Sequence, residues 1–139
     1  MRAVVQRVSR ASVRVSGELV SEIGAGLLVL LGVTHGDGEE DATRLAAKIR
    51  ALRVFDDAEG RMNEALGERE LLCVSQFTLY GDASRGNRPS WTAAAPAAVA
   101  EPLYERFCEL AGARRGAFGQ WMAVELVNDG PVTLLIESR

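Results

Sequence analysis

The chain has 139 residues, of which 47% are hydrophobic and 25% charged, and its formal net charge is −3. This composition is ordinary for a globular chain, and the length is that of one domain, residues 1–139, with a core of its own. The net charge argues against a nucleic-acid partner, which usually meets a basic face, but it does not report a local basic patch.

Neither a membrane segment nor a secretory leader is expected. The longest apolar run, residues 25–33, has the length of a strand and falls far short of the ~18 residues of a membrane span. Met1 leads directly into an alternating pattern rather than into a signal-peptide layout. Cys73 and Cys108 fall in a predicted strand and a predicted helix, which favours reduced core thiols and a cytoplasmic protein.

The N-terminal part of the chain predicts strands. Residues 2–9 alternate between two faces, as a half-buried strand does. Residues 11–15 and 18–23 flank Ser16-Gly17 and predict a hairpin. The apolar residues 26–33 then predict a buried strand.

A helix and a turn are expected next. Asp37 and Glu40 have the spacing of a capping box, and apolar residues then recur at helical spacing, which predicts a helix over residues 39–54. Residues 56–60, Asp-Asp-Ala-Glu-Gly, predict a turn. Residues 61–66 are either irregular or a short strand.

The middle of the chain changes character abruptly. Residues 71–74 are all apolar and predict a strand buried on both faces. Residues 75–78, Ser-Gln-Phe-Thr, then place polar groups where that strand leaves the core, and a loop punctuated by glycine follows over residues 81–86. Ligands bind at such strand ends because backbone N–H groups and short polar side chains converge there. The alternative is an ordinary polar turn.

The C-terminal part predicts a second helix and two strands. Pro96 suits the first helical position, an apolar stripe follows, and Gly112 ends the helix. Pro102 should bend that helix or leave a carbonyl unpaired. Residues 121–127 and 132–137 predict strands. With roughly seven or eight strands and two helices, the chain predicts an α/β architecture with mixed sheets.

The side chains give little support for conventional catalysis or for a cofactor. His35, the only histidine, lies on a predicted turn, where an exposed position is favoured over a catalytic triad. One histidine and two separated cysteines do not make a zinc ligand set. Asp56, Asp57 and Glu59 lie together but favour a solvated turn over a metal or acid–base site. No Gly-rich phosphate loop is present, so we expect neither a metal nor a cofactor.

Several ordered segments of the chain resemble the signature segments of the D-aminoacyl-tRNA deacylases, the D-tyrosyl-tRNA deacylase family. The resemblance runs from end to end of the chain. The segments are Ser75-Gln76-Phe77-Thr78-Leu79, Arg88-Pro89-Ser90, Asn128-Asp129-Gly130-Pro131-Val132-Thr133, and residues 6–8, 11–13, 23–29, 57–60 and 62–63.

This resemblance implies both a fold and an activity. The fold would be α/β with mixed, mostly antiparallel sheets, barrel-like and two in number, with two main helices packed outside, in an intertwined homodimer. The activity would be hydrolysis of the ester bond of D-aminoacyl-tRNA, and of mischarged glycyl-tRNA, which gives chiral proofreading in translation. Catalysis would be RNA-assisted, with tRNA as the nucleic-acid partner and no membrane.

The resemblance also assigns roles to individual residues. Ser75, Gln76 and Thr78 would be the catalytic positions, offering hydroxyls and N–H groups to the 3′-terminal adenosine and the ester carbonyl. Phe77 would pack against the substrate, although the sequence is as compatible with a core position. The other substrate-binding positions would be Arg7, Phe118, Met122, Gly130, Pro131, Val132 and Thr133.

Thr78 could in principle be a nucleophile, but no base lies beside it in the sequence, so it should react weakly. A site without a base could still cleave an ester that has a hydroxyl of its own as a neighbour. Aminoacyl-tRNA is such a substrate, because the terminal ribose carries a free hydroxyl next to the ester. The protein need then only orient that hydroxyl and a water molecule.

The segment Asn128 to Pro131 has two interpretations. Local rules predict an ordinary turn between two strands with a trans peptide bond before proline. The resemblance implies instead that Gly130-Pro131 is cis and reaches into the active site of the other subunit, where two carbonyls would clash with an L side chain at the substrate α-carbon. Arg7 would brace this segment by donating to the Gly130 carbonyl. Otherwise Arg7 is an outward-facing strand residue.

Two loops near the expected site carry residues of interest. Arg85, Asn87 and Arg88 would meet tRNA phosphates, which guanidinium groups suit, unless the loop is merely solvated. Gln120 and Trp121 depart from the small and variable residues expected there, which leaves this wall of the pocket undefined.

Two other classes of function stay open. One is a non-catalytic RNA- or ligand-binding module that keeps the fold, and hydrolysis of D-aminoacyl-tRNA by the pure protein would exclude it. The other is a general esterase that uses Thr78, which should cleave small activated esters without a vicinal hydroxyl.

Overall fold

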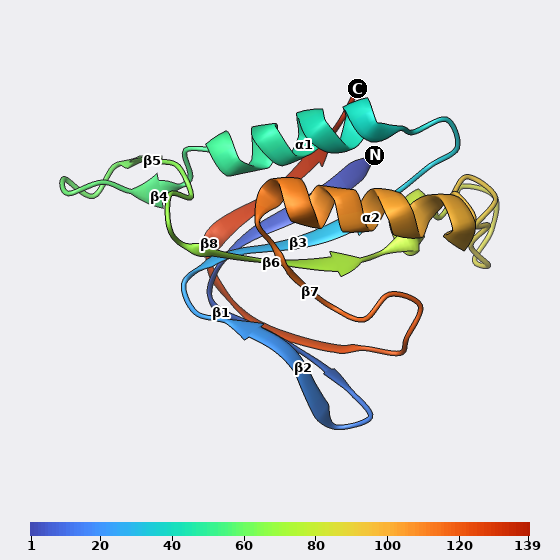
Figure 1. Cartoon of the computed structure of the whole chain (residues 1–139), viewed down its shortest axis with the longest axis horizontal. Helices are drawn as coiled ribbons and strands as arrows, with labels where there is room; N and C mark the ends of the chain where they lie inside the picture. The colour runs from blue at the N-terminus through green and yellow to red at the C-terminus, as the bar shows by residue number, and fades with distance from the viewer.

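The computed structural model describes all 139 residues. Two helices lie side by side across one face of a strongly curved sheet, and a small hairpin projects from one end (Figure 1). The elements are β1 (Arg2–Val15), β2 (Glu18–Ile23), β3 (Gly26–Gly32), α1 (Glu39–Ala51), β4 (Phe55–Asp56), β5 (Met62–Glu64), β6 (Glu70–Ser75), η1 (Phe77–Tyr80), α2 (Ala97–Ala111), β7 (Arg114–Arg115) and β8 (Ala123–Glu137).

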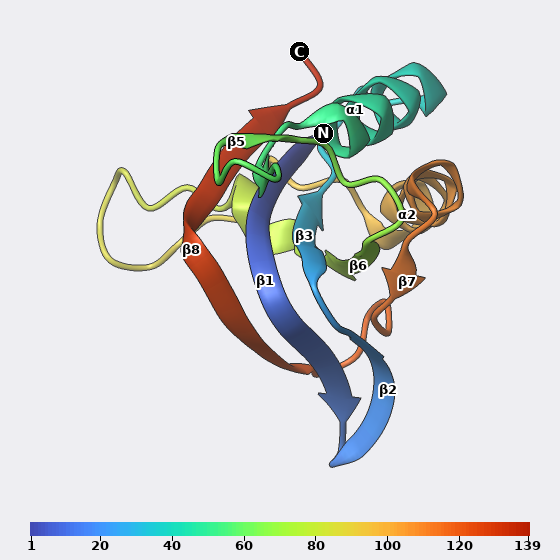
Figure 2. The ribbon, with the colours of Figure 1, turned by 90° about the vertical axis from the view of Figure 1, so that its left-hand side faces the viewer.

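The main sheet has six strands, and β1 pairs with three of the others. The order is β2-β1-β3-β6-β7, with β8 paired to β1 alone. The β1–β2, β1–β3 and β1–β8 pairs are antiparallel, whereas β3–β6 and β6–β7 are parallel. Figure 2 shows how β1 and β8 curve together into an open barrel. β4 and β5 form the second sheet, which is two-stranded and antiparallel, so the predicted α/β fold with two mostly antiparallel sheets, one of them barrel-like, is confirmed.

The central strands are buried on both faces. Under the helices, Val29 of β3 and Cys73 of β6 belong to a core of 23 buried residues with the inner sides of α1 and α2. On the opposite face, Leu28 and Leu72 belong to a second core of seven buried residues inside the barrel. Successive strand residues point to opposite faces, so a strand covered on both sides has to be apolar throughout. This explains the uninterrupted apolar run at residues 71–74.

Most predicted elements are confirmed, with shifts at their ends. The predicted strands 2–9 and 11–15 form one continuous strand, β1, and α1 ends at Ala51 rather than at residue 54. Pro96 is the N-cap of α2 rather than its first residue, and Pro102 lies inside that helix. The hairpin turn at Ser16-Gly17 has positive φ at both residues, as a tight turn between two strands requires.

The prediction of an ordinary turn between two C-terminal strands is wrong. Residues 123–137 form a single strand, β8, and the Gly130-Pro131 peptide bond within it is cis, as the resemblance implied. The pairing with β1 passes from Val8↔Asn128 to Gln6↔Thr133, so residues 129–132 bulge out opposite Arg7 alone. Asn128 closes the base of this bulge, because its side-chain amide donates to the carbonyls of Arg7 (3.0 Å) and Val132 (3.1 Å).

The start of α1 differs by one residue from the predicted capping box. Gly38 is the N-cap, and its N–H donates to the carboxylate of Asp41 (2.9 Å). The carboxylate of Asp37 instead accepts from Thr34 N–H (2.8 Å) and pairs with Arg139 (2.9 Å). Asp41 also accepts from the Ser138 hydroxyl (2.8 Å), so α1 is tied to the C-terminal end of the chain.

We expect Asp41 to make the protein sensitive to acid. Burial opposes its ionisation, but the hydrogen bonds from Gly38, Ser138 and Arg139 prevail and lower its pKa from 3.8 to about 2. Because the pKa is depressed in the folded state, the stabilisation is present above about pH 4 and is lost as the pH falls towards 2. Asp41→Asn should lower the free energy of unfolding by about 2 kcal/mol at pH 7 and flatten its decline between pH 4 and 2.

Urea unfolding at pH 7, 4 and 2.5 measures this effect. Glu101→Gln is the matched control, because Glu101 is an exposed carboxylate of α2 without an ion pair or a hydrogen bond. An equally steep acid decline in Asp41→Asn and in the unchanged protein would show that other carboxylates control acid stability.

Candidate functional site

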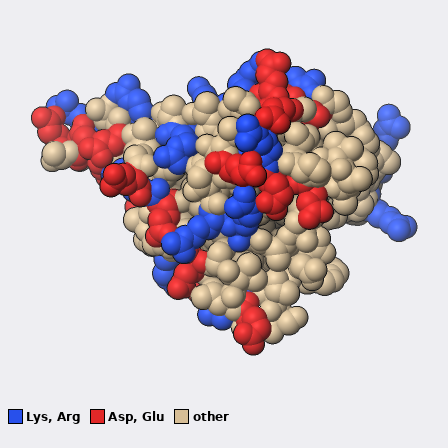
Figure 3. Space-filling view, in the orientation of Figure 1, with Lys and Arg blue, Asp and Glu red and all other residues tan.

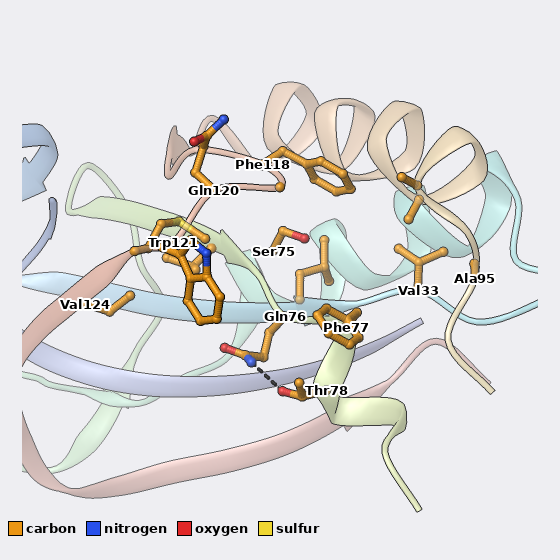
Figure 4. Close-up of a pocket in the computed structure, with 16 residues that line it drawn as sticks. Val33, Ser75, Gln76, Phe77, Thr78, Ala95, Phe118, Gln120, Trp121 and Val124 are labelled. Carbon is orange, nitrogen blue, oxygen red and sulfur yellow. Dashed lines mark hydrogen bonds between the residues drawn. The ribbon is translucent and has the colours of Figure 1, made fainter. Parts of the chain in front are cut away.

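The largest cavity of the protein lies where β6 leaves the sheet. It measures about 750 Å³ and is lined by 16 residues, 11 of them hydrophobic. They come from the ends of β3 and β6, from η1, from the first turns of α2 and from the loop before β8 (Figure 4). The structure thus brings together six of the predicted site residues. These are Ser75, Gln76, Phe77, Thr78, Phe118 and Met122.

The polar edge of the cavity is the turn from β6 into η1. β6 pairs with β3 as far as Ser75, and the N–H of Gln76 donates to the Leu31 carbonyl (2.8 Å). The chain then coils into the short 3₁₀ helix η1, so Phe77 and Thr78 point outward with exposed side chains. The Gln76 side-chain amide is hydrogen-bonded to the Thr78 hydroxyl. The core alternative for Phe77 is therefore wrong.

The opposite wall is held by contacts with β6 and α2. The N–H of Gly116 and the Tyr104 hydroxyl both donate to the Cys73 carbonyl (3.0 and 2.9 Å). The Tyr104 ring contacts Phe118, with 5.7 Å between ring centroids. The N–H of Ala117 donates to the Met122 sulfur (3.3 Å). Phe118 and Met122 therefore face the cavity from a fixed position.

Sequence reasoning missed Trp91, which supports the outer edge of the cavity. Its ring meets Phe77 edge-to-face at 5.5 Å between centroids. It also covers Gly81, where an added Cβ would lie 2.4 Å from the indole, so only glycine fits there. Two backbone hydrogen bonds between Asp82 and Ser90, both 2.8 Å, close the loop between them. The RPSW run of the sequence gave no indication of this aromatic contact.

No side chain in the cavity can exchange a proton near neutral pH. The lining contains no histidine, carboxylate, lysine, arginine or cysteine. A carboxamide is not a base at neutral pH, so Gln76 can orient the Thr78 hydroxyl without activating it. Cys73 lies two residues before Ser75, but it is fully buried, and burial raises its pKa well above the ordinary thiol value. The thiol is therefore neutral and unreactive.

The other titratable candidates lie away from the cavity. His35 is exposed on a turn, as predicted, and its Nε2 lies 2.8 Å from the Thr92 carbonyl. Asp57 accepts from the N–H groups of Arg61 (3.0 Å) and Glu59 (2.9 Å), and the backbone hydrogen bond from Arg61 lowers its pKa. Its carboxylate shapes the predicted turn. No group of three or more metal-ligating side chains is found, and no helix is long and apolar enough to cross a membrane.

Arg7 and residues 129–132 are brought together, but outside this cavity. The Arg7 side chain is 11% exposed. Its Nε donates to the Asp129 carbonyl (2.7 Å), one residue before the predicted acceptor Gly130, and its Nη1 donates to the Val54 carbonyl (2.7 Å). It therefore braces the bulge of β8. Val132 is buried in the core, whereas Gly130, Pro131 and Thr133 are exposed.

Arg85 and Arg88 lie in the exposed loop between η1 and α2. They are the only arginines of the chain with neither an ion pair nor a hydrogen bond. In Figure 3 the basic side chains at the right-hand edge, where Figure 1 places this loop, stand clear of acidic neighbours. Elsewhere on this face, acidic and basic side chains are interspersed. Although the net charge of the chain is negative, this loop therefore carries two arginines that no acidic side chain neutralises.

Known proteins of similar sequence match this chain over almost its whole length. The sequence profile of the family described as D-Tyr-tRNA(Tyr) deacylase matches residues 4–137. The D-aminoacyl-tRNA deacylase of Chlorobaculum parvum is 54% identical over 99% of this chain and 98% of its own length. That of Myxococcus xanthus is 57% identical over 99% of this chain and 95% of its own. The chain belongs to the D-aminoacyl-tRNA deacylase family. It is therefore a hydrolase of ester bonds.

Solved structures show the same fold. One titled c-Myc DNA Unwinding Element Binding Protein superimposes with a TM-score of 0.94 and 42% identity, over 100% of this chain and 99% of that one. Another, titled as a probable eukaryotic D-amino acid tRNA deacylase, superimposes with a TM-score of 0.84 over 98% of both chains at 17% identity. The resemblance found in the sequence is thus confirmed for the family and for the fold.

Proposed function

We propose that this deacylase hydrolyses D-aminoacyl-tRNA and mischarged glycyl-tRNA through catalysis assisted by the RNA itself. One observation carries the proposal: the cavity contains no side chain able to act as a base. Its volume of about 750 Å³ suits a nucleoside bearing an amino acid. The free thiols Cys73 and Cys108 suit a reducing compartment, and we place the reaction in the cytoplasm.

The reaction needs only water and a positioned ester. Water attacks the ester carbonyl, the bond to the ribose oxygen breaks, and the vicinal ribose hydroxyl relays the proton from the water to that leaving oxygen. Ser75, Gln76 and Thr78 would hold the carbonyl and the ribose with their hydroxyl, amide and N–H groups. Phe77, Phe118 and Met122 would enclose the adenosine. Fixing the reacting groups in this way replaces the missing base.

The proposal includes a homodimer. β8 pairs only with β1, so its other edge is unpaired along 15 residues, and it carries the exposed apolar side chains Val127, Leu134 and Leu135. A long unpaired apolar edge is a template for a second chain. Residues 128–133 do not line the cavity of their own chain. We propose that the exposed pair Gly130-Pro131 enters the partner's cavity and rejects L side chains there, while glycine and D side chains fit.

We expect the substrate hydroxyl to matter more than Thr78. Thr78→Ala should keep kcat within about tenfold of the unchanged enzyme, since it removes one positioning hydrogen bond. A D-aminoacyl-tRNA whose terminal ribose lacks the vicinal hydroxyl should react at least about a hundredfold more slowly, the usual contribution of acid–base assistance. Single-turnover rates with saturating enzyme measure both effects without interference from binding.

Four results would contradict this mechanism. One is an acyl-enzyme trapped on Thr78, and another is a normal rate with the deoxy substrate. Rapid cleavage of small activated esters that lack a vicinal hydroxyl would indicate a general esterase. If the protein binds D-aminoacyl-tRNA but never hydrolyses it, the non-catalytic alternative is correct.

Arg7→Met should reduce chiral discrimination while leaving the dimer intact. The substitution keeps the length of the side chain but removes the hydrogen bonds to Asp129 and Val54, so the bulge of β8 loses its brace. We expect the ratio of kcat/KM for D- over L-aminoacyl-tRNA to fall at least about tenfold, which corresponds to ~1.4 kcal/mol. Arg10→Met on the same strand is the control, because Arg10 is exposed and pairs with Glu125. A dimeric Arg7→Met enzyme with undiminished discrimination would refute the role of the bulge.

Arg85 and Arg88 should contribute to tRNA affinity through phosphates. The double variant Arg85→Ala/Arg88→Ala should weaken binding and reduce the slope of log affinity against log salt by about 2, since each lost phosphate contact lowers counterion release. Arg14→Ala is the control, because it removes one exposed charge from the β1–β2 hairpin. Filter binding over a salt series measures the slope, and an unchanged slope in the double variant would remove both residues from the interface.

A further inference from the structure

Trp121 is an aromatic side chain at the pocket that has no partner in the protein. It is 96% exposed, more than any other large hydrophobic residue of the chain. It nevertheless belongs to the lining of the main cavity. A tryptophan in a folded protein usually buries most of its ring. An exposed one at the mouth of a ligand pocket therefore points to a contact made by the ligand.

The backbone holds Trp121 in place at this mouth. Gly119 has a φ of +74°, and the N–H of Gln120 donates to the Ala117 carbonyl (3.2 Å), which makes a tight turn just before it. Met122, on its other side, is fixed by the N–H of Ala117. Figure 4 shows the Trp121 indole at one side of the cavity and the Phe77 ring at the other. The backbone of this loop thus fixes the position of Trp121, and the indole points outward.

The chemistry of this rim suits a nucleobase. The cavity of about 750 Å³ takes a terminal nucleoside with its amino acid, so the rest of the RNA strand has to leave through the mouth. The lining holds no charged side chain that would bind a phosphate. Stacking on aromatic rings is how proteins hold the bases of single strands, since every base has a π face.

We propose that Trp121 stacks on the nucleobase that precedes the terminal adenosine of the tRNA. Trp121 is then a specificity-determining residue for a single-stranded 3′ end rather than a catalytic residue. This inference rests on the proposed function, because it takes the 3′ end of an aminoacyl-tRNA as the occupant of the cavity. The indole is exposed in the free protein because its stacking partner is the substrate.

The decisive experiment compares substrates with and without that nucleobase. With D-aminoacyl-tRNA, Trp121→Ala should raise KM about tenfold or more and leave kcat unchanged, whereas Trp121→Phe should keep most of the affinity. With a D-aminoacyl-adenosine, which ends before the stacked base, the three proteins should have the same KM. Leu19→Ala is the control for loss of an exposed apolar side chain, because Leu19 lies on β2 outside the cavity.

Binding without catalysis tests the same contact. The trinucleotide CCA should quench the tryptophan fluorescence of the unchanged protein, the quench should disappear in Trp121→Phe, and it should persist in Trp91→Phe. An enzyme that is active on D-aminoacyl-tRNA but shows no such quench would overturn the role of Trp121 alone. A quench in a protein that hydrolyses no D-aminoacyl ester would support the stacking and refute the proposed function.

Two further outcomes would overturn the inference. An equal rise in KM for tRNA and for the aminoacyl-adenosine would show that Trp121 shapes the nucleoside pocket instead. A Trp121→Ala protein with a smaller mass in solution than the unchanged protein would show that the indole is covered by a second copy of the chain.

Discussion

The burial of β6 on both faces is the constraint on which the site depends. One face of the strand lies under α1 and α2, the other lies inside the barrel, and each is packed with its own apolar cluster. A polar side chain has no place at residues 71–74, the part of the strand that is buried on both faces. Ser75 is the first residue beyond the fully buried run, and the chain coils into η1 two residues later. The polar groups of the site therefore gather at a single edge.

Local patterns predicted the parts of the fold that depend on local physics. The apolar run at residues 71–74, the hairpin at Ser16-Gly17 and the helix over most of residues 39–54 follow from periodicity and turn chemistry, and all are present. The capping box was misplaced by one residue because Asp37 and Asp41 both have partners far along the chain. Contacts with such distant residues cannot be predicted from a short stretch of sequence.

The bulge of β8 shows why other parts of the fold could not be predicted from local sequence rules. Asn128 and Gly130 are turn-forming residues, so a turn was the local prediction, yet the segment stays in the sheet. What keeps it there is Arg7, 122 residues earlier in the chain, together with the amide of Asn128. Only the family resemblance pointed to this contact. The aromatic contact between Phe77 and Trp91 was missed for the same reason, since the loop that joins them closes only in three dimensions.

A cavity without a base also limits what the enzyme can do. A pocket lined by apolar side chains, amides and hydroxyls accepts many small esters by shape alone, so binding would discriminate poorly. If the proton relay comes from the substrate, an ester that lacks a neighbouring hydroxyl gains no rate even when it is bound. Recognition of the RNA and hydrolysis of the ester then depend on the same ribose. Under the proposed mechanism, the absence of a catalytic side chain from the pocket would act as a filter on the class of substrate, before the partner's segment selects the chirality of the amino acid.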